Sequence, residues 1–225
     1  IASYKSDISY CENEKHKAYE VNVNGIIELI KNLSQTNLKI IFLSSEYVFD
    51  GSTGKYSDEH LRNPKTSYGN HKKIVEDSIK NLTDNFVVLR LSKNYGLKKN
   101  DKTILDEAAN LLYQNKKVLA ASDQYFNPTL VDDLVETIIK IQEKNLNGYI
   151  NVCAPETWSR FEMHTHLAKI MGKDEKLIKK IKLYDIPIMK NRPLNTSMIC
   201  NRLNKEIRTK FTSIKDSISA LYCVL

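Results

Sequence analysis

A short apolar run that ends in two serines most constrains how this chain can fold. Residues 39–43, Lys-Ile-Ile-Phe-Leu, are rich in β-branched and aromatic side chains, which is typical of a buried strand. Ser44 and Ser45 follow at the carboxyl end of that strand. Open α/β sheets bind their ligands at this end of the strands, so we expect the two hydroxyl groups at a ligand-binding edge.

A helical pattern begins one loop later. Asn63-Pro64 marks a turn, and apolar side chains then recur at steps of three and four, as one face of a helix requires. A phenol and an ammonium continue the same face toward the start of the helix. The members of this face are Tyr68, Lys72, Val75, Ile79 and Leu82.

Tyr68 and Lys72 form a candidate acid–base pair. They are four positions apart and therefore neighbours on the helix surface. A lysine beside a phenol favours the phenolate and lowers the tyrosine pKa from about 10, which suits proton transfer near neutral pH. Ser45 could polarise the same substrate oxygen. A chance pair with both tips in water is the alternative, but the combination of strand, serines, turn and pair favours catalysis.

The same stretch resembles the extended short-chain dehydrogenase/reductases, and more narrowly the dTDP-4-dehydrorhamnose reductases and their sugar-nucleotide relatives. That family has Ser-Thr-Asp-Tyr-Val-Phe-Asp-Gly after the strand, where residues 44–51 here read Ser-Ser-Glu-Tyr-Val-Phe-Asp-Gly. Its Asn-Pro and Tyr-Gly-x-x-Lys match Asn63-Pro64 and residues 68–72. Ser45 keeps the hydroxyl of the threonine, and Glu46 keeps the charge of the aspartate, one methylene further out.

The resemblance implies an α/β fold, an incomplete Rossmann-type doubly wound parallel sheet with a small C-terminal substrate-binding lobe. Residues 1–92 and 127–153 would belong to the NAD(P)-binding Rossmann domain, and residues 93–126 and 154–225 to the lobe. Periodicity adds helices over 11–35, 103–115, 130–144 and 159–172 and strands over 85–91, 118–121 and 148–152.

The family begins with a glycine-rich turn that holds the cofactor diphosphate. None of the seven glycines here has G-x-G spacing. We therefore expect the chain to be the C-terminal part of a reductase whose first βαβ units lie outside it. The cofactor that the resemblance implies is NADPH or NADH.

The resemblance also assigns roles to residues. Ser45, Tyr68 and Lys72 would be catalytic, with Tyr68 protonating a keto oxygen that Ser45 holds. The residues expected at the cofactor are Ala2, Ser3, Tyr4, Asn22, Ser44, Tyr68 and Lys72, although an Asn22 satisfied by the backbone is an even alternative. Those expected at the nucleotide-sugar substrate are Glu46, Tyr47, Lys93 and Arg192. The implied reaction is the NAD(P)H-dependent reduction of a nucleotide-linked 4-keto-6-deoxysugar, in sugar-nucleotide biosynthesis.

Two departures keep other functions open. Lys93 stands where the family has a tryptophan near the sugar, and Phe126 replaces a glycine. Such losses would be tolerated in a non-catalytic regulatory protein, like the β subunit of methionine adenosyltransferase. An NAD-dependent epimerase or dehydratase is the third reading, in which Glu46 would serve as an acid or base.

Composition narrows the class of protein. The 225 residues carry a net charge of +7, but the lysines are spread along the chain without a basic–aromatic motif, so we expect no nucleic-acid partner. No apolar run approaches the roughly 18 residues of a membrane span. The four cysteines lack disulfide or metal spacing, and His164 and His166 point to different sides of a helix. We expect a cytoplasmic protein without a bound metal, and a homodimer stays open.

Overall fold

A parallel sheet forms the centre of the molecule. The computed structural model describes residues 1–2 and 4–222. The strands of the sheet are β1 (Ile40–Ser45), β2 (Phe86–Leu91) and β7 (Gly148–Val152), in the order β1-β2-β7. Ser45 pairs with Leu91, and Leu91 pairs with Val152, so the carboxyl ends of the three strands are level. The predicted α/β fold with a parallel sheet is confirmed.

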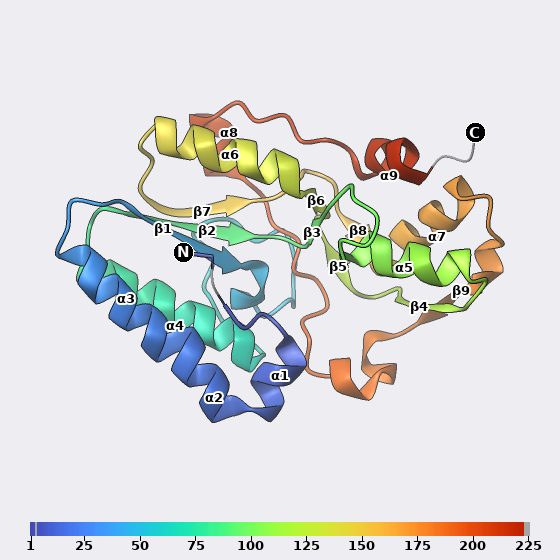
Figure 1. Ribbon diagram of the computed structural model, residues 1–225, viewed down its shortest axis with the longest axis horizontal. Helices are drawn as coiled ribbons and strands as arrows, with labels where there is room; N and C mark the ends of the chain where they lie inside the picture. Colours follow the sequence, from blue (N-terminus) through green and yellow to red (C-terminus); the bar gives the residue numbers. More distant parts are fainter. Residues whose placement is uncertain (3, 223–225) are drawn as a thin grey trace.

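Helices cover both faces of this sheet (Figure 1). α3 (Gly25–Ser34) and α4 (Ser67–Leu82) lie on one face, and α6 (Val131–Glu143) and α8 (Asn201–Glu206) lie on the other. Successive residues of β2 point to opposite faces of the sheet and belong to two different apolar cores. Val88 packs with α3 and α4, whereas Val87 and Leu89 pack with α6 and α8. A strand covered on both sides has no polar face, which explains the continuous apolar run at its start.

A third apolar core lies beyond the carboxyl ends of the strands (Figure 1). It includes the fully buried side chains of Leu105, Leu112, Met163 and Leu167. The elements around it are α5 (Ile104–Tyr113), β4 (Val118–Ala121), α7 (Arg160–Ile170), β9 (Ile178–Ile181) and α9 (Ile214–Tyr222). The strand β4 pairs in parallel with β9. A capping box joins Ser159 and Glu162 at the start of α7, a pattern that the sequence Ser-x-x-Glu favours.

Pairs of two-residue strands lie between the third core and the sheet. The pairs are β3 (Asn94–Tyr95) with β6 (Thr129–Leu130), and β5 (Tyr125–Phe126) with β8 (Trp158–Ser159). Single 3₁₀ turns are η2 (Glu46–Val48), η3 (Glu175–Leu177), η4 (Leu183–Asp185) and η5 (Pro187–Met189). No helix within the described residues is long and apolar enough to cross a membrane.

The predicted helix over residues 11–35 is divided into four pieces. They are α1 (Ile8–Asn13), α2 (Lys15–Tyr19), the π-helical turn η1 (Glu20–Asn24) and α3. The break falls at Glu14, whose φ of −109° and ψ of 50° are not helical. The wider π turn carries Asn22, whose side chain is fully buried. Such turns are frequent at functional sites, and a regular 3.6-residue period cannot predict them.

The predicted division into a Rossmann domain and a lobe stays a prediction. One observation bears on its boundary, because α8 comes from the segment given to the lobe but packs on the sheet through Leu203. Near it, the Sγ atoms of Cys153 and Cys200 lie 3.1 Å apart, both buried. Cysteines scattered in the sequence thus become neighbours, a contact that spacing alone does not predict.

The start of α4 is fixed by several contacts. Thr66 caps the helix by accepting a hydrogen bond from the Gly69 amide. Glu12 accepts hydrogen bonds from the backbone N–H and the hydroxyl of Ser67, which ties α1 to this end of α4. Gly69 faces η2, where an added Cβ would collide with the carbonyl oxygen of Tyr47. The glycine therefore lets α4 approach the chain that leaves β1.

We expect Gly69→Ala to lower the free energy of unfolding by about 1–3 kcal/mol, because overpacking separates α4 from η2. Asn70→Ala is the matched control, since Asn70 is exposed on the same helix turn and should change stability by less than about 0.5 kcal/mol. Urea denaturation of the two variants measures the difference. Equal stabilities would contradict close packing at Gly69.

Candidate active site

Two cavities meet at the carboxyl end of β1. The first, here the strand-end cavity, has a volume of about 290 Å³ and is lined by Ala2, Tyr4, Ser44, Ser45, Tyr68 and Lys72, among others. The second, the lobe cavity, has a volume of about 300 Å³ and is lined by Glu46, Tyr47, Lys93, Arg160 and Arg192, among others. Ser45 and Tyr68 line both cavities. A group held at these two hydroxyls is reachable from either side.

Lys72 is almost fully buried below the strand-end cavity. Its Nζ donates a hydrogen bond of 2.7 Å to the carbonyl oxygen of Leu43 and lies 3.4 Å from the ring centroid of Tyr4. Burial lowers the pKa of Lys72 to about 7, although the charge of Glu76 acts in the opposite direction. The ammonium is thus held in place by a carbonyl and an aromatic face.

The pKa of Tyr68 differs from the sequence-based expectation. Burial raises the pKa of Tyr68 to about 12, and a hydrogen bond with Ser45 opposes this only in part. The predicted lowering by Lys72 is wrong for this structure, because the ammonium is directed at Leu43 and Tyr4 and lies 5.8 Å from the Tyr68 ring centroid. Tyr68 therefore holds its proton at neutral pH, the state that a proton donor requires.

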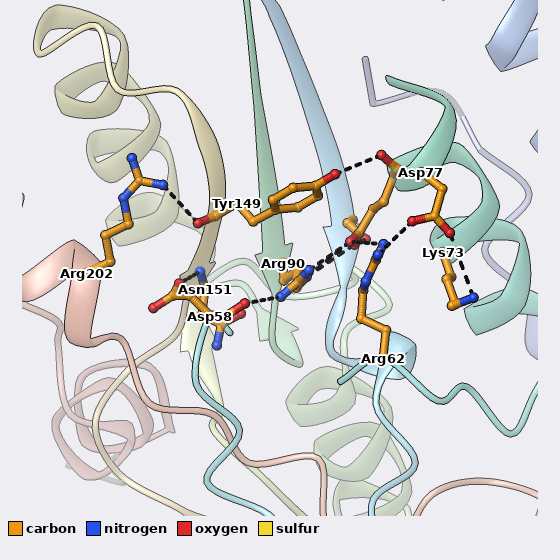
Figure 2. A network of polar contacts seen from close by, with 10 residues as sticks. Asp58, Arg62, Lys73, Asp77, Arg90, Tyr149, Asn151 and Arg202 are labelled. Atoms are coloured by element: carbon orange, nitrogen blue, oxygen red, sulfur yellow. Dashed lines mark hydrogen bonds and ion pairs between the residues drawn. The ribbon is translucent and has the colours of Figure 1, made fainter. Parts of the chain in front are cut away.

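A buried ion-pair network connects α4 to β2, and Figure 2 shows Arg62 and Arg90 within it. Glu76, one turn after Lys72 on α4, is fully buried and accepts hydrogen bonds from the Ser44 hydroxyl and the Arg90 guanidinium. Arg62 reaches the same carboxylate at 3.0 Å. Arg90 also donates to the carbonyl oxygen of Asp58 at 2.8 Å. The network fixes Ser44, at the end of β1, against both α4 and β2.

Sequence reasoning missed Glu76 and Arg90, although a signal for Glu76 was present. Tyr68, Lys72 and Glu76 follow one another at steps of four, so the carboxylate lies on the same helix face as the pair. Arg90 is the single charged residue of β2, in which every residue is buried. A charged residue in such a strand needs a buried counter-charge, and Glu76 provides it.

Glu46 and Tyr47 lie at the floor of the lobe cavity. Glu46 is 3% exposed and accepts a hydrogen bond from the Ser92 hydroxyl. Burial raises the pKa of Glu46 to about 7, while Ser92 and the charge of Lys93 act against that shift. Burial likewise raises the pKa of Tyr47 to about 12, opposed by the charge of Arg192. Glu46 can therefore exist in both protonation states near neutral pH.

Cationic and amide side chains form the wall on the lobe side. Lys93 and Arg192, both predicted from the sequence, line the cavity together with Arg160 and Gln124. The Arg160 Nε donates to the Gln124 side-chain oxygen at 3.1 Å. Arg160 and Gln124 were not predicted as site residues. Gln124 lies two residues before Phe126, and Arg160 directly follows the helix cap Ser159. Neither position reveals that the two side chains line the lobe cavity.

The remaining predicted residues are placed as follows. Asn22 does not line either cavity, since its side-chain amide accepts from the Lys5 N–H and donates to the Lys5 carbonyl. It holds the segment next to Tyr4, and direct cofactor contact stays a prediction. Ser3 lies outside the described residues. Within the described residues no cluster of three or more His, Cys, Asp or Glu could hold a metal ion.

The strand-end cavity fits part of a nicotinamide nucleotide. Among the described residues, the buried Tyr4 hydroxyl has no hydrogen-bond partner, and the Ser45 hydroxyl faces the same space. These groups could meet an amide or a ribose hydroxyl, and Lys72 could meet a ribose. The residues present therefore fit the cofactor that the motifs predict.

Comparison with known proteins identifies the family of this chain. A family model described as the RmlD substrate binding domain matches residues 1–224. The chain belongs to the RmlD substrate-binding domain family. This confirms the resemblance to dTDP-4-dehydrorhamnose reductases within the extended short-chain dehydrogenase/reductases. The family is one of NAD(P)-dependent sugar-nucleotide reductases.

Relatives of this RmlD-family chain are distant but cover it well. A dTDP-4-dehydrorhamnose reductase of Sinorhizobium fredii is 23% identical over 240 residues, covering 100% of this chain and 79% of that protein. The β subunit of methionine adenosyltransferase 2 of Mus musculus is 26% identical and covers 92% of this chain and 65% of that protein. Both an enzyme and a subunit named for another enzyme are therefore similar to this chain.

Solved structures give the same fold. The dTDP-4-dehydrorhamnose reductase of Bacillus anthracis in complex with NADP superposes with a TM-score of 0.89 at 21% identity, over 98% of this chain and 78% of that one. The UDP-glucuronic acid 4-epimerase of Bacillus cereus, in complex with UDP-glucuronic acid and NAD, superposes with a TM-score of 0.85 at 21% identity, over 98% and 72%. These structures confirm the Rossmann-type fold.

We expect Glu76→Gln to lower the free energy of unfolding by about 3–5 kcal/mol, because it leaves the Arg90 guanidinium buried without a counter-charge. Asp77→Asn is the control one residue later, since Asp77 is half-exposed and pairs with Arg62 and Lys73. It should cost no more than about 1 kcal/mol. Chemical denaturation at neutral pH compares them, and an equal loss in both variants would contradict the network's role.

Proposed function

We propose that this chain serves in the NAD(P)H-dependent reduction of a nucleotide-linked keto sugar, with a 4-keto-6-deoxysugar as the reference substrate. The observation that carries the proposal is the sharing of Ser45 and Tyr68 by two cavities. One cavity fits a nicotinamide nucleotide, and the other carries the cations that a nucleotide diphosphate needs. A carbonyl between them would meet a hydroxyl from each of two elements.

The proton chemistry follows from the site. A bound nicotinamide would supply the hydride to the keto carbon. Tyr68, protonated at neutral pH, would give its proton to the keto oxygen, and Ser45 would hold that oxygen by a hydrogen bond. Lys72, with a pKa near 7, would keep its hydrogen bond to Leu43 and orient a ribose hydroxyl.

The lobe cavity would orient the substrate. Glu46 and Tyr47 would contact the sugar, and Arg192 would meet the diphosphate, because a guanidinium can bind phosphate oxygens in pairs. Tyr4, Ala2 and Ser44 would line the nicotinamide side. We propose that the sheet with its helices corresponds to the cofactor domain and that the third core is the substrate lobe.

A regulatory role is the second candidate. It is favoured by the similarity to subunits of methionine adenosyltransferase, at 25–27% identity. In that role the two cavities would still bind nucleotides, but Tyr68 would not turn substrate over. The two candidates therefore agree on binding and differ on catalysis.

We expect Tyr68→Phe to lower kcat for NADPH oxidation with a 4-keto sugar nucleotide by about 10²–10⁴-fold, because the proton donor is lost. Binding of the sugar nucleotide should change little, since the ring remains. Tyr113→Phe, on the exposed side of α5, is the matched control and should keep full activity. Sugar-nucleotide binding without turnover in the unmodified chain would favour the regulatory role instead.

A further inference from the structure

Three cations surround the lobe cavity with little negative charge to balance them. The cations are Lys93, Arg160 and Arg192. Among the described residues that line the cavity, Glu46 is the one carboxylate. No ion pair joins any of the three cations to a carboxylate in residues 1–2 and 4–222. Within the part of the chain that the structure describes, the buried Nε of Arg192 has no hydrogen-bond partner. Such groups are costly unless a ligand of opposite charge meets them.

The cations influence one another directly. Lys93 keeps an exposed surface in the open cavity. The protein atoms around its ammonium still lower the pKa of Lys93, and the positive charges of Arg160 and Arg192 lower it further, while the charges of Glu46 and Glu107 oppose the shift. Burial and the charge of Arg192 likewise lower the pKa of Arg160. Three like charges that share one cavity with a single lining carboxylate indicate a site preorganised for a multiply charged anion.

Arg192 and Lys93 border different surroundings. Arg192 also lines a second cavity of about 420 Å³, together with Lys65, Tyr184 and Lys190. Lys93 follows the end of β2 by two residues, and Leu91 at that end pairs with Ser45. Its charge acts on Glu46. Arg192 is therefore placed at the nucleotide end, and Lys93 is placed near the reacting hydroxyls.

We propose that the sugar of the substrate itself carries an acidic substituent, such as a carboxylate, and that Lys93 recognises it. The inference rests on the proposed nucleotide-sugar function and changes one feature of the substrate. A diphosphate accounts for Arg192 and Arg160. The ammonium of Lys93, next to the sugar, calls for an additional negative charge there. A neutral sugar would shield the Lys93 ammonium from water without supplying a negative charge. A site discriminates strongly against a ligand that leaves one of its charges unpaired.

The test compares two nucleotide sugars that differ in one group. Isothermal titration calorimetry measures the Kd of the 225-residue chain for UDP-glucose and UDP-glucuronate, and for dTDP-glucose and dTDP-glucuronate, with UDP and dTDP alone as references. We expect the acidic sugar nucleotide to bind at least about tenfold more tightly than its neutral partner. Added salt should reduce this preference.

Lys93→Met should remove the preference, because it weakens the binding of the acidic sugar nucleotide more than that of its neutral partner. Lys98→Met, an exposed lysine on the same segment, is the matched control and should keep the preference. Equal affinity for acidic and neutral sugars in the unmodified chain would overturn the inference but leave the proposed function intact. Failure of the nucleotides and of all four sugar nucleotides to bind would overturn both. A preference that persists in Lys93→Met would also overturn the role of Lys93.

Discussion

The carboxylate of Glu76 is the constraint on which the site depends. It is fully buried, and the Arg90 guanidinium, the Ser44 hydroxyl and Arg62 satisfy it from three other segments. Because an uncompensated buried charge costs several kcal/mol, α4, β1 and β2 can depart from this arrangement only together. Lys72 and Tyr68 lie one and two turns before Glu76, so the same ion pair also sets their distance from the end of β1.

Burial, more than charge pairing, determines the protonation states in this site. Lys72 and Tyr68 are both moved toward their neutral forms, with pKa values of about 7 and about 12. A lysine beside a tyrosine would have the opposite effect on the phenol in a polar environment. The ammonium here is committed to Leu43 and to the Tyr4 ring, so its field reaches the phenol weakly. A protonated Tyr68 suits reduction, in which the keto oxygen gains a proton.

Much of the fold and of the site follows from local pattern. The strand predicted over residues 39–43 is found as β1, which extends through both serines to Ser45. That strand, the helix with Tyr68 and Lys72 on one face and the capping box at Ser159 all depend on near neighbours in the sequence. The π turn at Asn22 and the contact between Cys153 and Cys200 depend on packing between distant segments. The Glu76–Arg90 pair and the place of Arg160 do so as well, and periodicity carries no information on them.

The lobe cavity shows what a departure from a family pattern can mean. A tryptophan would bury apolar surface against a sugar, whereas Lys93 puts an ammonium there beside Glu46, Arg160 and Arg192. If the ligand were neutral at this point, the substitution would add a desolvated cation without compensation. Glu46 balances only part of the charge, because its own burial favours the protonated form. The lobe cavity therefore keeps an excess of positive charge, which in our proposal an anionic ligand completes.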